Sequence, residues 1–174
     1  LQFKAENSTY TIDKLARMMI TESDNSATNM LMARLGSMTD VNSALREWGL
    51  KHTYVQTWLP DLGGTNHSTA RDMAQILYNI DNPKFLSNSS REKIFDYMGH
   101  VHNNRLIAAG LPAGATFLHK TGDIGKMLGD AGIVYAPNGK KYIVVIFANR
   151  PHNSPLGKEF IVKASQTIYN NMVF

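Results

Sequence analysis

The chain has 174 residues, of which 43% are hydrophobic and 18% are charged, so it is a folding sequence long enough for one sizeable domain. Its 18 Lys and Arg against 14 Asp and Glu leave a net charge of +4, and no basic run alternates with aromatic residues, so we expect no nucleic-acid partner. The chain has no cysteine, which excludes disulfides, thiolate catalysis and cysteine-based zinc sites.

Targeting signals are absent from the sequence. No apolar stretch is long enough to span a membrane, and no signal peptide is present. The first residue is Leu1 rather than a methionine, and the residues that follow read like the middle of a protein. We therefore expect a fragment or a processed product.

Helical periodicity dominates the first two thirds of the sequence. Apolar residues recur at helical spacing between capping residues, with Thr11 and Thr39 as the expected caps of two helices. A segment over residues 52–67 interrupts the pattern with Pro60 and two glycines and predicts a loop. We expect helices over residues 11–22, 26–35, 39–48, 68–80 and 89–98.

Beyond residue 112 the period changes from helical to strand-like. The segment 141–148 is the most apolar, and the Asn138-Gly139 pair before it is a strong hairpin signal. Helices followed by a short antiparallel sheet and a final helix indicate an α+β fold. We expect a helical lobe over about 1–112 packed on a sheet lobe over about 113–174, with strands over 116–121, 131–136 and 141–148 and a closing helix over 156–172.

Two tripeptides carry chemistry. Ser23-Asp24-Asn25 stands at a break between two helices, and Lys120-Thr121-Gly122 stands at the end of the first strand. Either would be a weak signal alone. Together they are similar to two of the three signatures of class A β-lactamases and penicillin-binding proteins, the third being Ser-x-x-Lys.

The catalytic residue types fit acyl transfer from an amide, which needs a serine nucleophile and a route for its proton. The Ser23 hydroxyl can pass a proton between the nucleophile and the leaving nitrogen. Asn25 offers an amide to the substrate and to the catalytic lysine. Lys120 holds a positive charge near Ser23, which lowers the cost of moving that proton.

The resemblance to class A β-lactamases extends from Thr11 to the end of the chain. Residues 23–29 read Ser-Asp-Asn-Ser-Ala-Thr-Asn, residues 58–62 (Trp-Leu-Pro-Asp-Leu) resemble the family's Ω-loop, and residues 110–114 (Gly-Leu-Pro-Ala-Gly) precede the Lys-Thr-Gly strand as in the family. The resemblance implies that residues 1–174 are the C-terminal portion of a single β-lactamase-like catalytic domain. The N-terminal strands and the nucleophile helix would then lie outside this chain.

Four residues are expected to bind the substrate. Thr121 offers a hydroxyl to its terminal carboxylate, Gly122 lets its backbone lie against the strand, and the N–H of Asp123 is the expected oxyanion donor. Family members usually add an arginine for the carboxylate, but the stretch 130–132 (Asp-Ala-Gly) carries none. We therefore expect Arg105 to take that role.

The Ω-loop points to a particular activity. Leu59 stands where the β-lactamases carry the glutamate that activates water to release the acyl-enzyme, and leucine cannot act as a general base. The loop looks like that of cyanobacterial D,D-peptidases of class A β-lactamase shape, which release penicillins slowly. The resemblance implies an extracytoplasmic or periplasmic serine D,D-peptidase of the D-alanyl-D-alanine carboxypeptidase type, with peptidoglycan stem peptides and β-lactam antibiotics as ligands and no cofactor or metal.

The nucleophile motif is missing from its expected place, because no Ser-x-x-Lys precedes Ser23. We expect it to come from a missing segment or a companion chain. Two alternatives stay open: a class A-like β-lactamase, and a catalytically incomplete fragment or binding domain.

A later Ser-x-x-Lys, Ser90-Arg91-Glu92-Lys93, is rejected as the nucleophile. It follows Ser-Asp-Asn, against the family order. Ser89 with Glu92 three residues on reads as a capping box, which explains these residues without catalysis.

Three histidines call for separate interpretations. His100 and His102 have no third ligand at a suitable spacing, so they indicate surface residues rather than a metal site. His119, directly before Lys120, is expected at the edge of the cleft.

Overall fold

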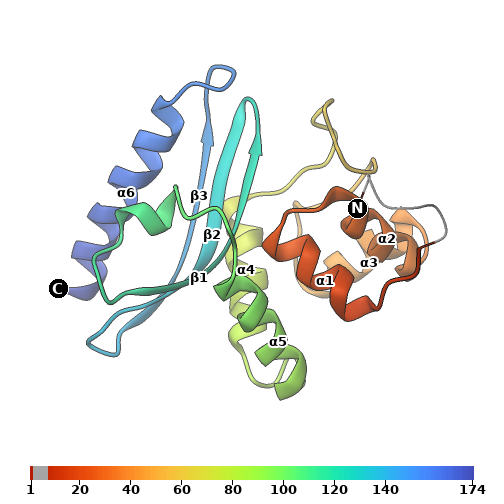
Figure 1. The fold of residues 1–174 in the computed structure, drawn as a ribbon, viewed down its shortest axis with the longest axis horizontal. Helices are drawn as coiled ribbons and strands as arrows, with labels where there is room; N and C mark the ends of the chain where they lie inside the picture. Colours follow the sequence, from red (N-terminus) through yellow and green to blue (C-terminus); the bar gives the residue numbers. More distant parts are fainter. Residues whose placement is uncertain (2–7) are drawn as a thin grey trace.

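The computed structural model describes residue 1 and residues 8–174 (Figure 1). Capping residues and turns divide this chain into helices and strands. The elements follow in this order: α1 (Ile12–Thr21), α2 (Asn25–Leu35), α3 (Met38–Glu47), α4 (Ala70–Asp81), α5 (Asn88–Gly99), the 3-10 helix η1 (Ile107–Gly110), β1 (Thr116–Ile124), β2 (Met127–Tyr135), β3 (Lys141–Asn149) and α6 (Leu156–Val173).

Side-chain caps fix where the first helices begin. Thr11 caps α1 as predicted, accepting a hydrogen bond from the backbone N–H of Lys14 at 3.2 Å. The prediction that Thr39 caps α3 was wrong. Ser37 does so in a capping box with Asp40, because this pair satisfies two backbone N–H groups reciprocally.

The sheet is antiparallel with the strand order β1-β2-β3. Its second hairpin turns at Asn138-Gly139 as predicted, and Gly139 has a φ of 85° that favours glycine. In the first hairpin, β1 continues past the predicted end at Thr121 to Ile124, and β2 begins at Met127. The register places Lys120 opposite Ala131 and Thr121 opposite Asp130.

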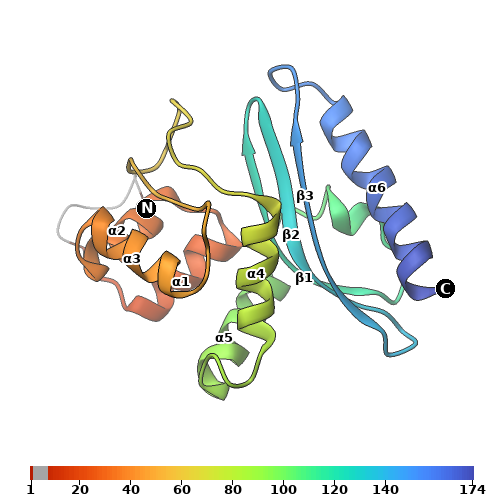
Figure 2. The ribbon, with the colours of Figure 1, turned by 180° about the vertical axis from the view of Figure 1, so that it is seen from behind.

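Helices cover both faces of this sheet. On one face α6 and η1 pack over a core that includes Val134 and Ile161, and on the other face α4 and α5 pack over Ile133. Figures 1 and 2 show α1, α2 and α3 grouped beyond α4 and α5, on the side away from α6. These observations confirm an α+β fold of helices on an antiparallel sheet.

The core is tightly closed where the layers meet. Ile107, Ile133, Val134 and Ile161 have no exposed side-chain surface, and burying each stabilises the fold by about 1.5–3 kcal/mol. No helix among the described residues is long and apolar enough to cross a membrane.

Candidate active site

The two motifs meet across the lobes. The Lys120 ammonium, on β1, donates hydrogen bonds to the Ser23 hydroxyl and, at 2.6 Å, to the carbonyl oxygen of Thr121. Ser23 lies between α1 and α2 with a φ of 54°, a left-handed conformation that is uncommon for residues other than glycine. Backbone strain of this kind is found at functional positions.

Burial changes the acidity of Lys120. Withdrawal of the ammonium from water lowers the pKa of Lys120 below its usual value, and the negative charge of Asp130 opposes this shift. An ammonium that yields its proton more readily, in contact with a hydroxyl, is suited to help move a proton through Ser23.

The remaining residues of the first motif have different environments. Asp24 is structural, because its carboxylate caps α2 by accepting a hydrogen bond from the N–H of Ala27 at 2.8 Å. Asn25, the first residue of α2, is exposed, and its amide makes no hydrogen bond with any residue that the structure describes. Its expected contact with a substrate stays a prediction.

A cleft of about 240 Å³ opens beside the Ser23–Lys120 contact. Above the strand, a Cβ added to Gly122 would meet no atom within 4 Å, so a ligand backbone has room to lie there. The cleft is lined by Glu22 and Ser23 from the α1–α2 break, His102 and Asn103 from the segment after α5, and Thr121 and Asp123 from β1.

Arg105 lies in a second, smaller pocket that shares Asp123 with the cleft. This pocket measures about 120 Å³ and is also lined by Arg150 and Lys158, so it is rich in positive charge. Arg150 is nearly buried and holds the Asp123 carboxylate at 2.5 Å. The structure thus places Arg105 beside the expected oxyanion donor, and its carboxylate-binding role stays a prediction.

The loop over residues 52–67 is tied to α2 through Leu59. The Asn29 side chain accepts a hydrogen bond from the N–H of Leu59 at 2.9 Å and donates one to its carbonyl oxygen at 2.7 Å. Both bonds involve the main chain of Leu59, so the loop is anchored whatever side chain stands there.

Asp61 closes the same loop. Its carboxylate accepts hydrogen bonds from the N–H groups of Asn66 at 2.6 Å and Thr65 at 3.0 Å. These backbone donors, that of Asn66 first, lower the pKa of Asp61. The sequence carries no signal for this role of Asp61, which stands two residues after Leu59 in the loop.

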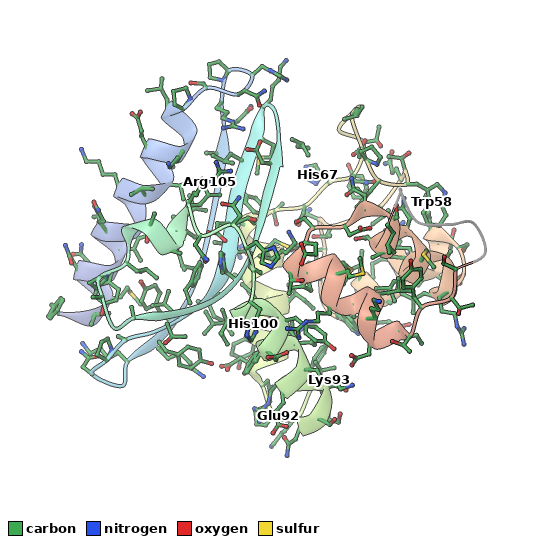
Figure 3. All side chains as sticks on the ribbon, in the orientation of Figure 1. Trp58, His67, Glu92, Lys93, His100 and Arg105 are labelled. Atoms are coloured by element: carbon green, nitrogen blue, oxygen red, sulfur yellow. The ribbon has the colours of Figure 1, made fainter. Side chains whose placement is uncertain are left out.

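The later Ser-x-x-Lys lies away from the cleft. Lys93 on α5 pairs with Asp13 on α1 at 2.5 Å, and Figure 3 shows Glu92 and Lys93 on α5, well away from Arg105. The expected cap at Ser89 was wrong. Ser87 caps α5 instead, because its hydroxyl accepts the hydrogen bond from the N–H of Ser90 at 3.2 Å.

The histidines occupy three different settings. His100, at the end of α5 (Figure 3), contacts Asp96 at 3.2 Å. His102 contacts Glu22 at 3.1 Å on the wall of the cleft, a position that its spacing in the sequence did not indicate.

The expectation that His119 lies at the cleft edge was wrong. His119 is only 1% exposed. Its side chain lies on the same face of β1 as Thr121, but the segment after α5 covers it, because the Asn104 side chain contacts its ring at 3.0 Å. His119 instead contacts Asp130, which is equally buried, at 2.8 Å.

Two site residues make contacts for which the sequence gives no local signal. Asn29 belongs to the quoted stretch 23–29, but only the folded loop reveals its bond to Leu59. Arg150 reaches Asp123 because it follows β3 at the same end of the sheet as Ile124. Strand order and register, rather than spacing, bring these residues together.

Comparisons with known proteins agree with this geometry. A model of the beta-lactamase enzyme family matches residues 1–172. Beta-lactamase 3 of Bacillus cereus is 30% identical over 148 residues, which cover 80% of this chain and 46% of that protein. The extended-spectrum beta-lactamase PER-1 of Pseudomonas aeruginosa is 26% identical over 172 residues, 91% of this chain and 56% of that protein. The chain therefore spans about half the length of these curated relatives.

Solved structures give the same picture. PBP-A superposes with a TM-score of 0.95 at 43% identity, covering 98% of this chain and 64% of that chain. A leucine-to-glutamate mutant of PBP-A, in an acyl-enzyme complex with penicillin G, superposes with a TM-score of 0.96 at 43% identity, covering 98% and 65%. The TLA-1 extended-spectrum beta-lactamase shares the fold, with a TM-score of 0.89 at 20% identity over 99% of this chain and 68% of that chain.

Proposed function

The chain belongs to the beta-lactamase enzyme family, and from that premise we propose that it forms the C-terminal portion of the catalytic domain of a serine D,D-peptidase. The enzyme would be of the D-alanyl-D-alanine carboxypeptidase type, would act on peptidoglycan stem peptides and would be acylated by penicillins. The Ser-x-x-Lys nucleophile would be supplied by a segment other than residues 1–174. An extracytoplasmic location follows from that substrate.

The contact between the Lys120 ammonium and the Ser23 hydroxyl carries this proposal. It joins a hydroxyl, held in an uncommon backbone conformation, to a lysine whose pKa is lowered by burial, beside an open cleft. If Lys120 were only a solvated lysine and Ser23 only a helix cap, none of these features would be needed. The pair is suited to relay the proton of a serine nucleophile.

The proposed reaction has two steps. The nucleophile attacks the carbonyl carbon before the last D-alanine, and its proton passes through Ser23 to the leaving nitrogen as the C–N bond breaks. D-alanine leaves, and water then cleaves the ester to regenerate the serine. The N–H of Asp123 would stabilise the oxyanion, and Thr121 with Arg105 would hold the carboxylate of the departing residue.

Leu59 favours a peptidase over the second candidate, a β-lactamase. The curated relatives named above are β-lactamases, which supports that alternative. A β-lactamase needs a base to hydrolyse its acyl-enzyme rapidly, and the Leu59 side chain offers no group that accepts a proton. The acyl-enzyme of the related PBP-A mutant supports acylation by penicillin in a fold of this kind.

The test is acylation of the full-length protein. Labelled penicillin should give a covalent adduct, seen by intact mass, that persists for hours, and a peptide ending in D-alanyl-D-alanine should release free D-alanine. Ser23→Ala should slow both reactions, whereas Ser90→Ala should change neither. Rapid turnover of penicillin without release of D-alanine would establish the β-lactamase instead.

A further inference from the structure

A chain of buried hydrogen bonds lies directly behind the Lys120 strand. The His119 ring contacts the Asp130 carboxylate through Nδ1 at 2.8 Å and the Asn104 side-chain oxygen through Nε2 at 3.0 Å. The second carboxylate oxygen of Asp130 accepts a hydrogen bond from the N–H of Ile107 at 3.0 Å. This chain joins β1, β2, the start of η1 and the segment that follows α5.

Both ring nitrogens of His119 face oxygen atoms. The Asn104 amide is oriented by its nitrogen, which donates to the carbonyl oxygen of Val101, so its oxygen points to the ring. A carboxylate oxygen and an amide oxygen only accept hydrogen bonds. The imidazole therefore has one hydrogen-bond partner at each ring nitrogen.

These partners support the walls of the proposed active site. Asn104 belongs to the segment that carries His102 and Asn103 on the cleft wall and Arg105 in the adjoining pocket. Asp130 stands opposite Thr121 in the sheet. His119 is the residue before Lys120, so its two hydrogen bonds tie this wall segment to the strand that carries the lysine.

The two strands of the first hairpin are closely packed at His119. A Cβ added to Gly132, its partner across the hairpin, would lie 2.7 Å from the His119 Cβ and 2.2 Å from a backbone oxygen. The ring also stacks on Phe117 at 4.5 Å between centroids. The imidazole is therefore held against Phe117, on a closely packed strand pair.

We propose that His119 is a positioning residue, whose hydrogen bonds to Asp130 and Asn104 clamp the cleft wall to the Lys120 strand. It touches no reacting atom and acts through the placement of Lys120 and Arg105. This proposal rests on the proposed acyl-transfer function, because it predicts an effect on the rate of acylation.

The kinetic test uses the full-length protein and penicillin G. His119→Phe and Asn104→Ala should each lower the acylation rate constant by about 10- to 100-fold, since a misplacement of about 1 Å near reacting groups can cost 10²-fold. The penicillin concentration for half-saturation should change less. His119→Gln keeps an N–H donor and should recover part of the rate that His119→Phe loses.

Ser165→Ala is the matched control. Ser165 is as buried as His119 and donates a hydrogen bond to the carbonyl oxygen of Ile107 at 2.9 Å, but among the described residues it makes no hydrogen bond to the side chains of His119, Asp130 or Asn104. It should lower Tm while the acylation rate stays unchanged. A normal rate in His119→Phe, or an equal rate loss in Ser165→Ala at matched Tm, overturns the proposal.

An independent measurement separates the clamp from the reaction. In nitrogen-15 NMR of the full-length protein at neutral pH, His119 should show a ring N–H signal that exchanges slowly with water, because its buried ring is hydrogen-bonded to the Asp130 carboxylate. Rapid exchange of every ring N–H of His119 overturns the clamp. If the unmodified protein gains no penicillin adduct, the proposed function fails, and the ring signals still decide whether the clamp forms.

Discussion

At the scale of single residues, the buried charge of Lys120 serves the proposed reaction but destabilises the folded protein. Burial favours the neutral amine, so the pKa of Lys120 falls from its unfolded value of about 10.5. Between the lowered pKa and 10.5 the unfolded chain binds more protons, so the contribution of this group to stability rises with pH there. Below the lowered pKa the charged ammonium keeps a net destabilising contribution.

Replacing Lys120 by methionine should therefore stabilise the protein at neutral pH. We expect Tm to rise by a few degrees in thermal unfolding of the full-length protein, because the buried charge is removed and its volume is roughly kept. Acylation by penicillin should fall by about 10²–10³-fold, the typical cost of losing a proton-transfer or electrostatic group. A lower Tm at neutral pH would show that the hydrogen bonds to Ser23 and Thr121 outweigh the desolvation.

The side chain of Leu59 is expected to set the lifetime of the acyl-enzyme. Leu59→Glu should speed deacylation by about 10²–10⁴-fold, the usual contribution of a placed general base. The decay of the penicillin adduct, followed by mass spectrometry, measures this. Leu62→Glu, in the same loop but 88% exposed, is the control and should leave the lifetime unchanged. An equal effect of both changes would mean that loop charge, not position 59, governs release.

At the scale of elements, the sequence predicts the type and order of the helices and strands better than it predicts where each one ends and which residues it contacts. Alternating apolar residues and Asn138-Gly139 predict the β2–β3 hairpin, because the signals are local. The cap at Ser37 was missed because two capping residues stand two apart, and only one pairs with Asp40. The burial of His119 was missed because it depends on the register that sets Asp130 within reach.

The structure of the Ω-loop is expected to depend on pH, through the ionisation of Asp61. Because backbone donors lower the pKa of Asp61, its stabilising contribution is complete above the ordinary aspartate pKa of about 3.9 and is lost as pH falls through the lowered value. The indole N–H NMR signal of Trp58, in the same loop (Figure 3), should stay constant from pH 7 to about 4 and shift only below. In Asp61→Asn that acid shift should vanish, and a wild-type shift above pH 5 would contradict this account.

At the scale of the molecule, the site exists only where the lobes meet. Ser23 comes from the helices and Lys120 from the sheet, so their contact reports how one lobe sits on the other. The joint between α1 and α5 includes the hydrogen bond from the buried Tyr97 hydroxyl to Asp13 at 2.8 Å. The paired motifs indicated a shared site, but spacing alone could not give this joint.

Tyr97→Phe tests the joint between α1 and α5. Loss of its hydrogen bond should lower the free energy of unfolding by about 1 kcal/mol, measured with urea, because a typical intramolecular hydrogen bond contributes that much. Tyr78→Phe, an exposed tyrosine on α4, is the matched control and should change little. Equal losses in both variants would show that the bond to Asp13 is not what stabilises the joint.

The bond between Asn29 and the main chain of Leu59 has a consequence for evolution. Because Asn29 bonds only to the main chain at position 59, a mutation that changes the side chain there leaves the loop anchored. Few mutations would then separate a protein that forms a long-lived adduct with penicillin from one that hydrolyses penicillin. Descent within such a family would leave the anchoring asparagine in place while the neighbouring side chain varies.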